Sequence, residues 1–256
     1  MALDDRTMSL LGHLEELRWR LVKALLAIVA AFVPTYAYVT QLFVLLLQPL
    51  HGLPDPPPVV GLAPAEAFFA KLKVAFIAAI FAASPVVFYQ LWQFVAPGLY
   101  QNEKRYAIPF VLFASLFFLL GAGFCYEVVL PIAYAFFLDE YKTIGVQATL
   151  RISEYFSFTS RMLLAFGVTF ELPVLAFFFT RVGLITHRTL IDFFRYSVVV
   201  IFILAAVLTP GPDVASQLLL AGPLLLLYLI SIGVAYVFGK RETTREEVEI
   251  TPTPDP

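Results

Sequence analysis

Charged residues are scarce in this sequence: Asp, Glu, Lys and Arg together make up 14% of its 256 residues. A soluble domain carries about 25% charged residues, and here hydrophobic side chains fill the difference, at 60% of the chain. The formal net charge is −2, so the basic face of a nucleic-acid-binding protein is not expected. The composition predicts a protein that crosses a membrane several times and argues against a nucleic acid as partner.

Reactive side chains are equally scarce. The single cysteine, Cys125, lies within an apolar run and is expected to be a buried packing residue. The three histidines, His13, His51 and His187, are far apart along the chain. The motifs HExxH, GxSxG and CxxC and a phosphate-binding glycine loop are all missing. These absences argue against an enzyme, and we expect no metal site and no cofactor.

Six apolar segments are present, and we expect them to be the transmembrane helices of one all-α, polytopic domain, residues 1–238. At ~1.5 Å per residue, about 20 residues cross the ~30 Å hydrocarbon core. The fifth segment is shorter than this, because Thr209 and Pro210 end it. The last hairpin is therefore expected to be short and to thin the bilayer locally. The expected spans cover residues 21–47, 67–94, 107–130, 155–180, 196–208 and 214–238.

The segments beside these spans are more polar. Residues 9–20 carry leucines at helical spacing, which predicts a helix lying along the membrane surface. Lys71, Lys73 and Arg161 lie near span ends and are expected to extend toward the interface. Residues 239–256 are polar and are expected to form a disordered tail.

The distribution of positive charge predicts the orientation. An even number of spans places both termini on the same side, and most of the 17 Lys and Arg residues fall on that side. Because Lys and Arg accumulate in cytoplasmic loops, both termini are predicted to be cytoplasmic.

Two carboxylates are expected at the cytoplasmic surface, Glu15 and Glu103. Glu16 can pair with Arg20 four residues later, whereas Glu15 has no basic residue at that spacing. Glu103 follows an aromatic stretch that includes Phe94, as is typical of a membrane interface. Each carboxylate could be a solvated surface charge. Alternatively, the two could bind one ligand that carries guanidinium groups, since Arg donates bidentate hydrogen bonds to carboxylates.

Glu171 lies about midway along the fourth expected span. A charged side chain at that depth costs at least ~2.5–3.5 kcal/mol, so Glu171 must be protonated, face a wet cavity or have a partner. One interpretation is a neutral carboxyl group bonded inside the bundle. The other is a functional site, which would also suit a secondary transporter that moves a small solute with a proton or an ion.

Asp213 and Gln217 are one helical turn apart at the start of the sixth span. Asp213 could simply cap this helix, with Gln217 at the interface. Alternatively, the two could form a polar docking point for another transmembrane helix.

Four motifs in this order resemble the TatC family of the twin-arginine protein translocase. They are HLEELRWRL at 13–21, the stretch from Ser84 to Arg105, FGVTFELPV at 166–174, and the run from Thr209 to Pro223. Together they extend over most of the chain, from about residue 9 to residue 238.

The resemblance implies a non-enzymatic receptor for export of folded proteins, driven by the proton-motive force, in a bacterial inner membrane. In this family, residues matching Glu15, Phe94 and Glu103 bind Arg-Arg signal peptides, and the acid matching Glu171 lies on the concave face of a cupped bundle. Residues matching Thr209, Asp213 and Gln217 dock single-span TatA- and TatB-type subunits. A homo-oligomer within the complex is also implied.

Two positions depart from the family pattern. The family usually has TPPD where this chain reads Thr209-Pro210-Gly211-Pro212-Asp213, and it often has an acid where Leu229 stands here. Both differences concern the docking of partner subunits and leave the expected binding of the arginine pair unchanged.

Overall fold

The computed structural model describes residues 10–95, 107–209 and 214–239 as a bundle of long helices. In this part of the chain, five helices are long and apolar enough to cross a membrane. Two shorter apolar helices are also present in this part of the chain. One of them, α8 (Phe194–Leu208), has 15 residues, about 22 Å at ~1.5 Å per residue. The all-α, polytopic fold is therefore confirmed. The five long segments are Gly12–Ala37, Glu66–Phe94, Ile108–Thr143, Ile152–Val182 and Val214–Phe238.

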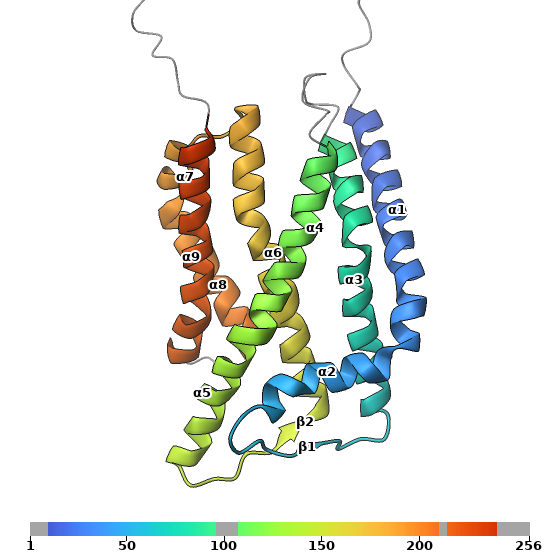
Figure 1. Ribbon diagram of the computed structural model, residues 1–256, viewed down its shortest axis with the longest axis vertical. Coiled ribbons are helices and arrows are strands. Elements are labelled where there is room, and N and C mark those ends of the chain that lie inside the picture. The colour runs from blue at the N-terminus through green and yellow to red at the C-terminus, as the bar shows by residue number, and fades with distance from the viewer. Residues whose placement is uncertain (1–9, 96–106, 210–213, 240–256) are drawn as a thin grey trace, which may run out of the picture.

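Different parts of the chain lie at the two ends of the bundle (Figure 1). Helix α1 (Leu10–Ala37) begins, and α9 (Val214–Phe238) ends, at one end, which we call the termini end. The opposite end, which we call the sheet end, holds a two-stranded parallel sheet of β1 (Val59–Val60) and β2 (Leu150–Arg151).

The N-terminal region differs from the expected surface helix at 9–20 and span at 21–47. Helix α1 runs without a break from Leu10 to Ala37, with Pro34 in its last turn, and no Gly or Pro interrupts residues 13–33. A separate helix, α2 (Val39–His51), follows and crosses the bundle at the sheet end (Figure 1). Residues 39–47 therefore belong to this crossing helix and not to the first long helix.

Tyrosine side chains hold α2 in place. Pro49 lacks an N–H and so leaves the carbonyl of Leu45 without its helical partner. The hydroxyl of Tyr126 donates to that carbonyl at 2.8 Å, and the hydroxyl of Tyr155 donates to the carbonyl of Leu46 at 2.6 Å.

The third long segment consists of three joined helical pieces. Helix α4 (Ala107–Phe124) continues through a π-helical turn, η3 (Cys125–Val129), into α5 (Leu130–Thr143). The π turn ends two residues before Pro131, which has no N–H to donate to a helical hydrogen bond. As a result the helix reaches Thr143, well beyond residue 130 where the expected span ended.

Helix α6 (Ile152–Val182) is the central helix and packs against α3 (Glu66–Val95), α4 and α9. Glycines let α4 and α6 approach closely: a Cβ at Gly121 would lie 2.5 Å from the carbonyl oxygen of Phe166, and one at Gly167 would lie 2.8 Å from the ring of Phe118. Small residues commonly allow such contacts between membrane helices. Beyond α6, the short α7 (His187–Asp192) leads into α8.

Buried Glu66 joins the loops at the sheet end. Its carboxylate accepts hydrogen bonds from the backbone N–H groups of Leu62 at 2.7 Å and Ala63 at 3.2 Å. It also accepts from the hydroxyl of Ser153 at 2.6 Å and from the guanidinium of Arg151. One carboxylate therefore connects the start of α3 with β2 and the start of α6.

Candidate functional site

The exposed carboxylate of Glu15 lies on α1 at the termini end. Its neighbour Glu16 accepts a hydrogen bond from Arg20 at 2.9 Å, as the spacing predicts. Within the described residues Glu15 takes part in no ion pair. Of the two adjacent acids, Glu15 is therefore the one that can receive a cation from outside the chain.

Phe94 contacts the start of α1, near Glu15 in the sequence, through a ring stack that the sequence did not predict. The ring of His13, two residues before Glu15, stacks on the ring of Phe94 with centroids 4.4 Å apart and planes 22° apart. This stack joins α1 to α3, which pack along each other. No sequence pattern predicts this contact, because the partners are 81 residues apart and a lone histidine has many possible roles.

Other aromatic side chains pack near the end of α3, toward the interior of the bundle. Trp92 is buried and meets the ring of Phe178 edge-on, with centroids 4.4 Å apart. Phe110 lies 4.9 Å from Trp92 between centroids. Rings from α3, α4 and α6 thus fix the end of α3, from which Phe94 projects. Glu103 belongs to residues 96–106, outside the described part of the chain.

Glu171 is buried on α6, with 6% of its surface exposed. Neither of its carboxylate oxygens has a hydrogen-bond partner among the described residues. Pro173 leaves the nearby carbonyl of Thr169 without its helical donor, which adds a second polar atom to this part of α6. An unpaired carboxylate is costly in an apolar interior, so this surrounding favours Glu171 as a neutral acid.

Two polar residues of the α8–α9 hairpin form hydrogen bonds within it. The side-chain amide of Gln217 donates to the carbonyl of Phe202 at 2.7 Å, joining α9 to α8. Thr209 is buried, and its hydroxyl donates to the carbonyl of Ala206 at 3.2 Å. Asp213 lies outside the described residues. The structure therefore places Thr209 and Gln217 in one hairpin and does not describe the third predicted docking residue.

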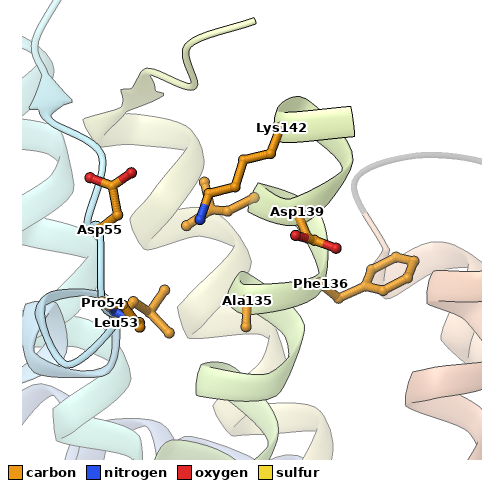
Figure 2. Close-up of a pocket in the computed structure, with 8 residues that line it drawn as sticks. Leu53, Pro54, Asp55, Ala135, Phe136, Asp139 and Lys142 are labelled. Atoms are coloured by element: carbon orange, nitrogen blue, oxygen red, sulfur yellow. The ribbon is translucent and has the colours of Figure 1, made fainter. Parts of the chain in front are cut away.

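A cavity at the sheet end was not predicted from the sequence. It has a volume of about 400 Å³ and lies between the loop after α2 and the end of α5 (Figure 2). Lys142 extends between Asp55 and Asp139, while Phe136 points away from them (Figure 2). This cavity is at the opposite end of the bundle from Glu15 and Phe94. Among the described residues, no group of three or more His, Cys, Asp or Glu side chains could hold a metal ion.

Comparisons with known proteins agree on one family. A family model described as "Sec-independent protein translocase protein (TatC)" matches residues 12–223. The protein of that name from Desulforapulum autotrophicum is 40% identical over 248 residues, covering 96% of this chain and 91% of the relative. The one from Campylobacter jejuni is 45% identical over 239 residues, covering 93% and 97%.

A solved structure gives the same result for the fold. The crystal structure described as "Twin Arginine Translocase Receptor- TatC" superimposes with a TM-score of 0.79 at 36% sequence identity. The match covers 87% of this chain and 97% of that one.

Proposed function

Because this chain belongs to the TatC family of Sec-independent protein translocase proteins, we propose that it is the translocase subunit that binds Arg-Arg signal peptides. The observation that carries the proposal is the exposed carboxylate of Glu15 on the same turn of α1 as His13, whose ring stacks on Phe94 of α3. Its neighbour Glu16 is already neutralised by Arg20. The site therefore offers one acid that forms no ion pair among the described residues, within one helical turn of an aromatic contact.

Glu103 supplies the second carboxylate of the proposed site. The end of α3 and the start of α4 both lie at the termini end, together with Glu15 (Figure 1). The chain between these two helix ends contains Glu103. Two carboxylates suit an arginine pair, because each guanidinium can donate two parallel hydrogen bonds to one carboxylate. Phe94 supports the apolar part of the peptide.

The orientation that this function requires places both termini in the cytoplasm of a bacterial cell. Arg18, Arg20 and Lys23 begin α1 at the termini end, and Arg181 and Arg188 flank the loop after α6 at the same end. This accumulation of basic residues favours a cytoplasmic termini end. Signal peptides of cargo proteins, which arrive from the cytoplasm, then reach Glu15 directly.

The remaining predicted residues serve assembly in this proposal. Thr209, Asp213 and Gln217 on the short hairpin dock the transmembrane helices of single-span TatA- or TatB-type subunits. Glu171, whose oxygens have no hydrogen-bond partner among the described residues, acts in assembly or transport and not in peptide binding. Several copies of this chain then assemble in one complex. The solute-transport alternative rests on Glu171 alone, and the family favours the translocase.

A peptide swap tests the receptor function. Membranes that contain the protein are incubated with a photo-reactive signal peptide that carries Arg-Arg, and with a matched peptide that carries Lys-Lys. Cross-linking is expected to fall with Lys-Lys, because an ammonium group cannot form the two parallel hydrogen bonds of a guanidinium. Equal cross-linking of the two peptides would refute the proposed recognition.

A further inference from the structure

Two basic side chains converge on one serine of α6, far from the proposed peptide site. The ammonium of Lys73, on α3, donates to the hydroxyl oxygen of Ser157 at 2.5 Å. The guanidinium of Arg161, one turn later on α6, donates through Nε to the carbonyl of Ser157 at 3.2 Å. Lys73 and Arg161 are both exposed. Ser157 thus holds two positive charges together on the face where α3 meets α6.

No carboxylate neutralises these two charges. Within residues 10–95, 107–209 and 214–239, the ion pairs are Arg20–Glu16 and Arg151–Glu66. Glu154 lies on the same face of α6 as Arg161, seven residues earlier, but pairs with neither cation. Lys73 and Arg161 each use a single donor on Ser157 and retain further N–H groups. The pair is therefore a site with donors and charge available to an anion.

Lys73 and Arg161 meet at the same level along the bundle as the crossing helix α2. Tyr155 and Phe156, which come just before Ser157, both contact α2: the hydroxyl of Tyr155 donates to Leu46, and the ring of Phe156 stacks on Phe43 with centroids 3.9 Å apart. Helix α2 crosses the bundle and exposes apolar residues such as Val44. A helix of this kind lies at the level of lipid headgroups.

The side chains of Lys73 and Arg161 extend toward the sheet end, as expected for cations near that membrane surface. Helices α3 and α6 both begin at the sheet end, and helical side chains lean toward the N-terminus of their helix. Arg161 does so, because its hydrogen bond reaches back one turn to Ser157. Both cations therefore extend toward the headgroup region of the leaflet at the sheet end, as long basic side chains do in membranes.

We propose that Lys73 and Arg161, positioned by Ser157, bind the phosphate group of an anionic phospholipid in the leaflet at the sheet end. The guanidinium donates paired hydrogen bonds to phosphate oxygens, and the ammonium adds a point charge. Basic sites between transmembrane helices recognise anionic headgroups in this way. A zwitterionic lipid binds less well, because its own ammonium offsets the charge of its phosphate.

Native mass spectrometry of the purified protein tests this site. Phosphatidylglycerol and phosphatidylethanolamine with the same acyl chains are added in parallel, and the lipid adducts are counted. For phosphatidylglycerol, we expect affinity to fall about fivefold with Lys73→Gln or Arg161→Gln alone and more than tenfold with both changes. The control variant combines Lys71→Gln with Lys142→Gln, which removes the same charge from the sheet end and should leave phosphatidylglycerol binding unchanged.

Four results would overturn the proposal. The first is an unchanged phosphatidylglycerol affinity in the double variant, and the second is an equal loss in the control. The third is displacement of phosphatidylglycerol by inorganic phosphate, which would assign the site to a soluble anion. The fourth is normal lipid binding together with loss of small single-span subunits on co-purification, which would assign the cations to a protein partner. If the double variant does not fold, Lys73→Arg with Arg161→Lys must retain phosphatidylglycerol binding, and its loss would also refute the site.

Discussion

Replacement of Glu15 by glutamine removes one negative charge from the proposed peptide site and keeps the shape of the side chain. Glu15 is exposed on α1, and its helix is joined to α3 by the His13–Phe94 stack. The change therefore should not move α1. Glu16→Gln is a matched control, because it alters the adjacent residue in the same way and disrupts only the ion pair with Arg20.

The expected effect follows from the bonds that glutamine cannot form. A hydrogen bond to a charged group contributes about 1.5–3 kcal/mol, and the exposure of Glu15 favours the lower value. A loss of about 1.5 kcal/mol weakens binding of an Arg-Arg peptide about tenfold. The pair broken by Glu16→Gln is of the i,i+4 type and contributes about 0.3–0.5 kcal/mol to stability, with no effect on the peptide.

Fluorescence anisotropy of a labelled signal peptide, with the protein in lipid nanodiscs, measures both variants. Circular dichroism of the same samples checks that they are equally helical. Wild-type affinity in Glu15→Gln, or an equal loss in Glu15→Gln and Glu16→Gln, would refute the assignment of Glu15 to the site.

Three further predictions concern other parts of the molecule. Glu171→Gln should leave peptide affinity unchanged and reduce cargo export or co-purification of single-span subunits; lost peptide binding in a folded variant would contradict this. Gly121→Ala should destabilise the protein by about 1–3 kcal/mol, because the new Cβ meets a backbone oxygen at 2.5 Å. Gly222→Ala, where a Cβ meets nothing within 4 Å, should be neutral in the same denaturant titration, and equal effects would rule out the close approach of α4 and α6. Glu66→Gln should lower the thermal unfolding temperature in detergent more than Glu154→Gln does, since Glu66 accepts four hydrogen bonds at the sheet end; equal effects would show that the sheet end contributes nothing.

The sequence predicted the membrane class and the all-α fold, because long apolar segments have few alternatives in a bilayer. The helix boundaries predicted from the sequence were less accurate. Residues 39–47 are as apolar as a spanning segment, yet they form the crossing helix α2. What fixes α2 is hydrogen bonding from Tyr126 and Tyr155, and these tyrosines are distant in the sequence. Apolar composition alone cannot distinguish the two placements.

In the candidate site, too, local spacing predicted some contacts, while others depend on how the helices pack. The spacing of Glu16 and Arg20 predicted their ion pair, and thereby that Glu15 would be without one. The contact of His13 with Phe94 depends on how α1 packs against α3, and no local pattern encodes it. Similarly, Lys73 and Arg161 were expected to extend toward the interface, but only the packing of α3 on α6 shows that they meet at Ser157.

A photo-crosslinker placed beside the arginine pair of a signal peptide gives the most direct test of whether Glu15 and Glu103 serve one ligand. After irradiation, the adducts are digested and mapped along the chain. A single crosslinker position is expected to label both the start of α1 around Glu15 and the segment that contains Glu103. Labelling of only one of these segments, or labelling that persists when the arginines are replaced by lysines, would contradict a shared site.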